Sequence, residues 1–312
     1  SHPAGDGIDA IELRNMTSQP INIGGWYLSD SSGNYHKFRI PDNTIILAGG
    51  YLVFDEDDFN ASGGVAPGDF GLSGAHGDDV WLMVAEPDGT LVRFADHVDF
   101  GAAVGGESFG RWADGSGNLY PMQSVTLGAA NSTPRIGPVV ISEVHYQPEG
   151  SENAAWEYVE LYNPTGSSVN IGGWQLQDGV TFEFAAGTTI GAYSTLVIVT
   201  FDPAISATRT AFEAYYGLTP GAVAMVGPYA GSLSNGGETV ELCRPDTPPA
   251  EEPDFIPWLL VDAVTYDDVA PWPTSPDGGG DSLNRRSPRS LGDVAGGWLA
   301  AAPTPGAYAE QT

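Results

Sequence analysis

The sequence predicts an all-β protein built from two homologous domains, each a sandwich or barrel of short strands. The first observation is an internal repeat, because residues 11–30 and 159–178 align without a gap and 11 of the 20 aligned pairs are identical. The second is composition, since 42 glycines and 24 prolines disfavour long helices and favour strands joined by turns. The third is length: 312 residues accommodate two domains of roughly 150 residues.

Alternating apolar and polar residues predict a series of short strands in the first copy. These strands are expected at 8–14, 21–29, 35–40, 51–54, 79–85 and 91–100. Gly24 and Gly25 interrupt the second of them, where a bulge or close packing is expected. Residues 55–71 form an acidic, glycine-rich excursion, and residues 105–118 form a loop. Turns that recur every 8–12 residues or so are typical of a sandwich or barrel.

The second copy differs from the first in two elements. It opens at 139–146 with the β-branched strand VVISEVHY, whose counterpart in the first copy would precede Ser1. The first domain is therefore expected to lack its opening strand and to expose a sheet edge. The second copy also inserts 203–217, where Pro203 at the start, apolar residues at helical spacing and a final glycine predict one short helix.

Further strands are expected in the second copy at 238–244 and 258–266, the latter matching 91–100. The segment 278–286 matches 105–112, and the closing turn 304–307 matches 126–129. We place the two domains at 1–134, without its first strand, and 135–312.

Six residues of the repeat are expected to serve the core. They are Trp26, Trp174, Gly25, Gly173, Glu12 and Glu160. The tryptophans are expected inside because a buried indole contributes a large apolar area. The glutamates lie on strands between apolar neighbours, and a buried carboxylate needs a hydrogen-bond partner. A structural contact to a backbone amide or an arginine is one interpretation of the glutamates, and ligand binding is the other.

The charge balance restricts the classes of partner. The net charge is −29, from 11 basic and 40 acidic residues, and Lys37 is the single lysine. Such a field repels nucleic acid and anionic lipid, but it is compatible with divalent cations or simply with solubility. No run of about 18 apolar residues predicts a membrane span. Cys243 is alone, so no internal disulfide is expected. The start at Ser1 without methionine is typical of an excised fragment.

Two acidic segments have the oxygen ligands that Ca²⁺ prefers. Asp55, Asp57 and Asp58 follow a strand end, and Asp114 and Asn118 have the alternating spacing of a calcium loop without its final glutamate. Calcium is therefore a possible cofactor, and the alternative is that each segment is only a polar turn.

Two short strings are similar to hydrolase motifs. Residues 106–110 read G-E-S-F-G, but a nucleophile elbow requires a following helix, and R-W-A-D-G is not helical. Residues 280–283 read G-D-S-L at the matching repeat position, so one repeated turn explains both strings. No H-x-x-x-H or C-x-x-C pair predicts a zinc site. We expect no catalytic residues; the alternative is an enzyme whose site lies between the domains.

The repeat resembles the lamin tail domain in its bacterial form. The resemblance rests on the strand ISEVHY (141–146), the run E-x-x-E-L-Y-N (157–163), the run N-I-G-G-W-x-L-x-D (170–178) and the closing T-P-G-A (304–307). It implies an immunoglobulin-like β-sandwich in each copy, without catalytic residues. It also implies an accessory module of a secreted or surface protein. The DNA binding of eukaryotic relatives transfers poorly to a chain of charge −29.

We therefore expect a non-catalytic binding or spacer module of a secreted or cell-surface bacterial protein. It would mediate protein, glycan or surface attachment through exposed loop aromatics such as Trp258, Trp272 and Tyr229. The alternative is an accessory domain pair of a hydrolase or nuclease whose chemistry lies elsewhere. A third hypothesis is that another chain supplies the missing strand of the first copy.

Overall fold

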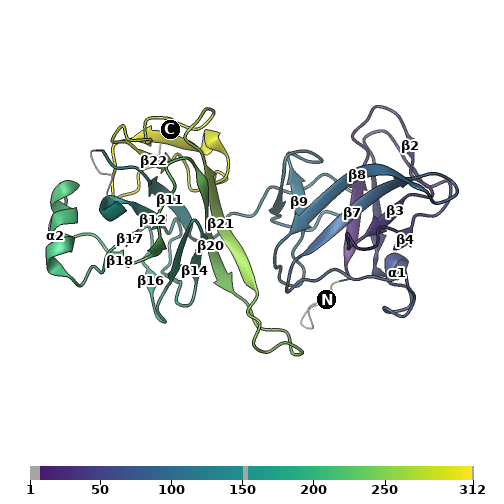
Figure 1. Cartoon of the computed structure of the whole chain (residues 1–312), viewed down its shortest axis with the longest axis horizontal. Helices are drawn as coiled ribbons and strands as arrows, with labels where there is room; N and C mark the ends of the chain where they lie inside the picture. Colours follow the sequence, from purple (N-terminus) through teal and green to yellow (C-terminus); the bar gives the residue numbers. More distant parts are fainter. Residues whose placement is uncertain (1–7, 150–153, 311–312) are drawn as a thin grey trace. The chain divides into compact units, whose positions relative to one another are not determined.

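Both halves of the chain fold as immunoglobulin-like β-sandwiches in a computed structural model that describes residues 8–149 and 154–310 (Figure 1). The first compact unit contains the chain up to Arg135 together with Asp246–Leu259. The second unit contains Ile136–Pro245 and the chain from Leu260 onward. The segment 246–259 thus groups with the first unit although it lies within the second copy of the sequence.

The first unit pairs a four-stranded sheet, in the order β4-β3-β7-β8, with shorter pieces β1-β6, β9-β10 and β2-β5. Its elements are β1 (Ala10–Arg14), β2 (Ile21–Asn22), β3 (Tyr27–Ser29), β4 (Phe38–Arg39), β5 (Ile45–Ile46), β6 (Tyr51–Asp55), α1 (Glu56–Phe59), β7 (Asp78–Ala85), β8 (Leu91–Phe100), β9 (Phe109–Trp112) and β10 (Asn118–Pro121). Its core packs Leu28, Ile40, Phe54 and Phe59 between these layers.

The second unit packs the six-stranded sheet β18-β17-β12-β11-β22-β23 against the five-stranded sheet β19-β15-β14-β20-β21. Its elements are β11 (Val140–His145), η1 (Ala154–Trp156), β12 (Tyr158–Tyr162), β13 (Val169–Asn170), β14 (Gln175–Asp178), β15 (Val180–Glu183), β16 (Thr189–Ile190), β17 (Thr195–Val199), α2 (Ser206–Tyr215), β18 (Met225–Val226), β19 (Ala230–Gly231), β20 (Glu238–Pro245), β21 (Trp258–Tyr266), β22 (Ser282–Arg285), η2 (Ala295–Gly297) and β23 (Trp298–Ala301).

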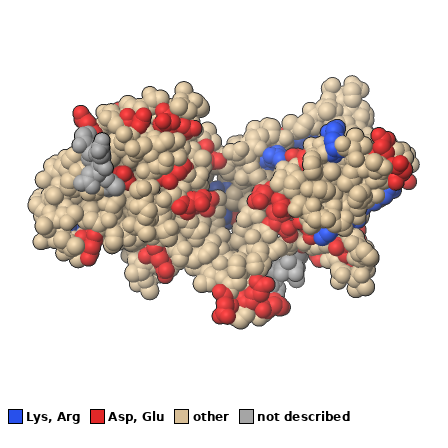
Figure 2. Space-filling model, in the orientation of Figure 1, with Lys and Arg blue, Asp and Glu red and all other residues tan. Residues whose placement is uncertain are grey.

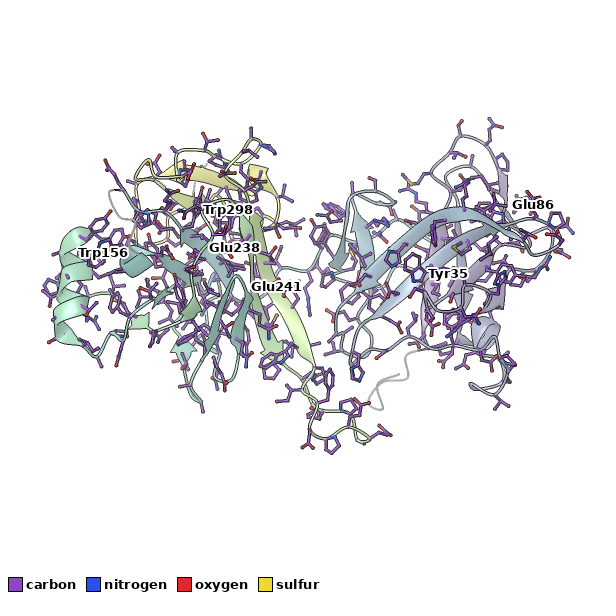
Figure 3. All side chains as sticks on the ribbon, viewed as in Figure 1. Tyr35, Glu86, Trp156, Glu238, Glu241 and Trp298 are labelled. Atoms are coloured by element: carbon purple, nitrogen blue, oxygen red, sulfur yellow. The ribbon has the colours of Figure 1, made fainter. Side chains whose placement is uncertain are left out.

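The inserted segment of the second copy contains the predicted helix, α2. Its buried Phe212 packs with Tyr158, Val197 and Val199 of the neighbouring strands. Trp156 stacks on Tyr215 with 5.3 Å between ring centroids, beside α2 in Figure 3. The insertion therefore adds a second, smaller apolar cluster outside the sandwich core.

The paired glycines of the repeat have the same two roles in both units. A Cβ on Gly24 or Gly172 would lie less than 3.0 Å from the backbone of a neighbouring turn, so only glycine permits that close approach. Gly25 and Gly173 have φ values of 85° and 81°, in the left-handed region that favours glycine. These constraints explain why both glycines recur before each tryptophan.

The repeated asparagines stabilise the same turns in both units. Asn15 Nδ2 donates to the carbonyl of Ile46, and Asn163 Nδ2 donates to that of Ile190, each at 3.0 Å. The side chain of Asn22 accepts a hydrogen bond from Gly24 N at 2.9 Å. In the second copy, the side chain of Asn170 accepts one from Gly172 N at the same distance. Hydrogen bonds from side chains to the backbone thus stabilise the turns of the repeat in both units.

The repeated tryptophans have equivalent backbone positions. Trp26 N donates to the carbonyl of Ile23 at 3.1 Å, and Trp174 N donates to that of Ile171 at 3.0 Å. Trp174 is buried within the second core, whereas Trp26 is partly buried against the first core. Both indoles therefore pack against the interior of their own unit.

Candidate functional site

The repeated glutamates hold the closing turn of each unit. Glu160 Oε2 accepts a hydrogen bond from Gly306 N at 2.7 Å, and Glu12 Oε2 accepts one from Gly128 N at 2.5 Å. Gly306 and Gly128 occupy the same place in the T-P-G-A and T-L-G-A turns. Each glutamate side chain therefore connects the closing turn of its unit to the first strand of the repeat, β1 or β12.

A second buried glutamate extends this network in the second unit. Glu143 on β11 accepts hydrogen bonds from the hydroxyls of Tyr158 and Ser282 and, at 3.0 Å, from Thr304 N. Ser282 is the serine of the G-D-S-L string, and it is fully buried at the start of β22. Its hydroxyl therefore serves a structural network rather than a nucleophile–histidine pair.

Burial and the neighbouring Glu143 raise the pKa of Glu160 from 4.5 to about 8. The folded chain therefore binds more protons than the unfolded chain between these two values. The stabilisation due to Glu160 is complete below pH 4.5 and is lost as the pH rises through 8. Burial lowers the pKa of His145 from 6.5 to about 4, which acts in the opposite sense below pH 6.5.

We predict that the free energy of unfolding of the second unit falls between pH 7 and 8, above the pKa of about 7 to which burial raises Glu157, by up to roughly 1.4 kcal/mol per pH unit. Glu160→Gln should remove most of this slope because the amide keeps the acceptor for Gly306 N and has no proton to lose. Urea unfolding of both proteins across this range measures the difference. Equal slopes would show that Glu160 is ionised in the folded state.

A buried ion pair fixes the position of β11 in the same unit. Asp262 on β21 is paired with Arg285 on β22. Asp262 Oδ2 accepts from Ile141 N at 2.8 Å, and Arg285 Nη1 donates to Ile141 O at 3.0 Å. The pair thus binds both backbone polar groups of one residue of β11.

The carboxylates predicted to bind calcium lie at opposite ends of β6. Asp55 ends β6 and caps α1, which contains Asp57 and Asp58. Asp114 accepts a hydrogen bond from Tyr51 at the start of β6, at 2.6 Å, and forms an ion pair with Arg14. Asn118 begins β10.

Within residues 8–149 and 154–310, no three His, Cys, Asp or Glu side chains are grouped so that they could hold a metal ion. Calcium binding by the acidic segments stays a prediction.

Two of the three aromatic residues expected to bind a ligand are core residues. Tyr229 and Trp272 are buried in the second unit. The ring centroids of Trp272 and Trp298 are 6.3 Å apart, and Trp298 is labelled in Figure 3. The expectation that these two side chains are exposed was wrong. A position in a loop predicts exposure, whereas the loops that contain these residues fold back onto the core of the second unit. Trp258, at the start of β21, is partly buried.

A groove lined by three tyrosines lies on the second unit, with a volume of about 460 Å³. The rings of Tyr162 and Tyr308 stack with 4.3 Å between centroids, and Tyr193 is 66% exposed. Arg289 and Glu310, both exposed, supply one charge of each sign. We call these five residues the tyrosine groove.

The tyrosine groove contains an unpaired buried hydroxyl. Tyr308 Oη is buried and has no hydrogen-bond partner among the described residues. Burial raises the pKa of Tyr308 and of Tyr162, so both hydroxyls keep their protons at neutral pH. The groove therefore combines apolar ring surfaces with hydrogen-bond donors, as small-molecule sites do.

Tyr193 has an unusual backbone for its residue type. Its φ is 52°, in the left-handed region that disfavours any residue with a Cβ. The equivalent position of the first unit is Gly49, with a φ of 66°. The equivalence follows from strand pairing, since Leu52 and Leu196 pair with the repeated leucines Leu13 and Leu161. The second unit thus presents a tyrosine where the same turn accepts glycine without strain.

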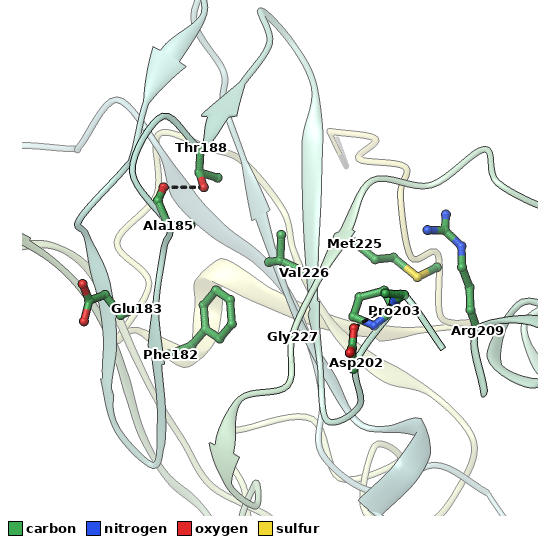
Figure 4. Close-up of a pocket in the computed structure, with 11 residues that line it drawn as sticks. Phe182, Glu183, Ala185, Thr188, Asp202, Pro203, Arg209, Met225, Val226 and Gly227 are labelled. Atoms are coloured by element: carbon green, nitrogen blue, oxygen red, sulfur yellow. Dashed lines mark hydrogen bonds between the residues drawn. The ribbon is translucent and has the colours of Figure 1, made fainter. Parts of the chain in front are cut away.

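A second hollow, of about 420 Å³, lies between β15, the start of α2 and β18 (Figure 4). Glu183, Asp202 and Arg209 are its charged residues, and Phe182 and Val226 are among its apolar ones. Arg209 already pairs with Glu213 at 2.9 Å. This hollow therefore offers fewer free donors and less aromatic surface than the tyrosine groove.

The surface charge is dominated by carboxylates. Acidic side chains are spread over both units on the face shown in Figure 2, and basic side chains are few. Among the described residues, no helix combines the length and the apolar character required to cross a bilayer.

Comparison with known proteins finds one family. The model of the family described as Lamin Tail Domain matches residues 1–100 and 132–254, which include both copies of the repeat. No curated protein and no solved structure matches the chain. The match indicates no catalytic family.

Proposed function

The chain belongs to the lamin tail domain family, and from this premise we propose that it is a non-catalytic binding module whose tyrosine groove holds a neutral glycan. The observation that carries the proposal is Tyr193. An exposed tyrosine in a left-handed conformation costs on the order of 1 kcal/mol, and such strain is concentrated at functional sites. The tyrosine groove is therefore the best-supported binding site.

The chemistry of the groove favours a sugar chain. Flat tyrosine rings offer apolar surface to a sugar face, above all the ring of Tyr193, which is 66% exposed. A net charge of −29 disfavours anionic polysaccharides, which leaves neutral glycans.

The first unit lacks this arrangement. Arg14, Gly49 and Ala130 stand at the positions that correspond to Tyr162, Tyr193 and Tyr308. The proposal therefore assigns glycan binding to the second unit alone.

We extend the proposal to location and context. The module would act on a secreted or cell-surface bacterial protein, as the resemblance to bacterial lamin tail domains implies. The alternative is an accessory pair of a hydrolase or nuclease, whose chemistry would lie in another part of the protein.

We predict that Tyr193→Gly abolishes glycan binding while the free energy of unfolding stays equal or rises by about 1 kcal/mol, because glycine relieves the left-handed strain. A glycan array identifies the ligand, and calorimetric titration of wild-type and variant protein measures the loss, expected to exceed tenfold. Tyr215→Ala, which removes an exposed tyrosine of α2 outside the groove, is the control.

The reciprocal change Gly49→Tyr should destabilise the first unit, because the same strain is then introduced there. Two outcomes would contradict the proposal: an array on which the wild-type protein binds no glycan, or a Tyr193→Gly protein with unchanged affinity. Binding only to proline-rich peptides would assign the groove to another ligand class.

A further inference from the structure

The four-stranded sheet of the first unit has aromatic rings on its outer face. Val80 and Val98, which pair across β7 and β8, pack into the core. Successive residues of a strand point to opposite faces, so the next pair, Trp81 and His97, lies on the outer face. Their rings stack with 3.6 Å between centroids.

Two further rings extend this cluster. Tyr35, labelled in Figure 3, comes from the loop between β3 and β4. Its ring centroid lies 5.3 Å from those of Trp81 and Phe94, and the last two are also 5.3 Å apart. We call Tyr35, Trp81, Phe94 and His97 the aromatic strip.

The aromatic strip is open to solvent. Phe94 is 52% exposed, and every residue of β8 from 92 to 96 is exposed. Trp81 and Tyr35 are half-buried, so each still has ring surface at the outside. A single exposed aromatic residue is common, but a contiguous group on one face marks an interaction site.

Two carboxylates border the aromatic strip at one end. Asp79 and Asp99 pair two residues further along the same strands, so they share the outer face with Trp81 and His97. Asp79 Oδ1 lies 2.5 Å from His97 Nε2, and Asp99 is exposed. Aromatic faces and carboxylates both attract cations, so this face is suited to a positively charged side chain.

His97 shows how such a side chain can be held. Its flat ring lies on the indole of Trp81 while one of its nitrogens contacts the carboxylate of Asp79. A guanidinium group is likewise flat, stacks on aromatic faces and donates in a fork to carboxylates, which favours arginine over lysine. The net charge of −29 attracts a basic partner over a longer range.

The second unit does not have the aromatic strip. Leu82 and Leu242 pair with the repeated leucines of β3 and β14, so Glu241, labelled in Figure 3, stands at the position of Trp81.

The neighbouring strand shows the same difference. The ion pair of Asp96 with Arg111, at 2.8 Å, is the counterpart of the buried ion pair of the second unit. His97 follows Asp96, and Ala263 stands at the matching position. The aromatic strip is therefore a property of the first unit alone.

We propose that the aromatic strip binds arginine side chains of an extended basic segment in a separate protein. A second copy of this chain is disfavoured as the partner, because two chains of net charge −29 repel each other. This inference is independent of the tyrosine groove, which lies on the second unit.

The test uses the full chain and a peptide in which arginine alternates with glycine, labelled for fluorescence anisotropy. Binding should be saturable at an ionic strength of about 0.15 M, where distant charges are screened. The same peptide with citrulline in place of arginine has nearly the same shape without the charge. It should bind at least about tenfold more weakly.

Trp81→Leu combined with Phe94→Leu keeps apolar side chains and removes two ring faces, so the affinity for the arginine peptide should fall at least about tenfold. Phe94→Leu alone, at an exposed position that the fold does not depend on, should weaken binding about threefold. Tyr215→Leu, which removes an exposed ring of α2, is the control and should leave the affinity unchanged. Circular dichroism checks that each variant folds.

Three results would overturn the proposal: no saturable binding, equal affinity for the citrulline peptide, or an unchanged affinity of the Phe94→Leu protein. The last result would assign the attraction to net charge alone.

Discussion

Arg285→Met should destabilise the second unit by about 3–5 kcal/mol, because it leaves the carboxylate of Asp262 buried without its cation. The same change in the first unit, Arg111→Met, should cost about 0–1 kcal/mol, since that ion pair is exposed. Calorimetry measures the change in unfolding free energy of each variant, and hydrogen exchange measured separately for the amides of each unit shows which unit is destabilised. The two units thus provide equivalent ion pairs that differ strongly in burial.

A double variant separates the contribution of the ion pair to stability from the cost of leaving one charge buried and unpaired. Asp262→Leu combined with Arg285→Met removes both charges, and apolar replacement of a buried pair is often close to neutral. The double variant should therefore be more stable than Arg285→Met alone. A single variant that costs less than 1 kcal/mol would show that the pair does not hold β11.

Trp174→Ala should destabilise the second unit by about 3–5 kcal/mol, because it removes a buried indole and leaves a cavity. Trp26→Ala should cost less, since Trp26 is only partly buried. Thermal unfolding of both variants measures the difference, and Trp174→Phe should recover part of the loss. A Trp174→Ala protein of wild-type stability that fails to bind ligand would assign this tryptophan to binding instead of packing.

The sequence predicted the features that depend on local backbone chemistry. The repeat of Gly-Gly-Trp identifies a turn in which one glycine is packed against backbone and the next is left-handed, and both units show it. The inserted segment, with its proline start and glycine stop, predicted the helix α2. The family resemblance predicted the sandwich of each unit, which family match and structure confirm.

Contacts between distant segments could not be predicted in this way. The tyrosine groove joins β12, the turn before β17 and the end of the chain, and no local pattern places these three together. One signal was available: the repeat alignment puts Tyr193 opposite Gly49 in a turn, which is an unusual exchange. The burial of Tyr229 and Trp272 could not be predicted, because burial within loops depends on the whole sandwich.

Residue-resolved hydrogen exchange of the full chain tests the central claim most directly. Both units follow one plan, but among residues 8–149 and 154–310 only the second unit has a strand, β11, between the equivalent strands, which are β12 and β22 there and β1 and β9 in the first unit. The amides of β12 should therefore be protected along both edges, whereas those of β1 that are not bonded to β6 should exchange at least a hundredfold faster than their counterparts. Equal protection of the two strands would contradict the account.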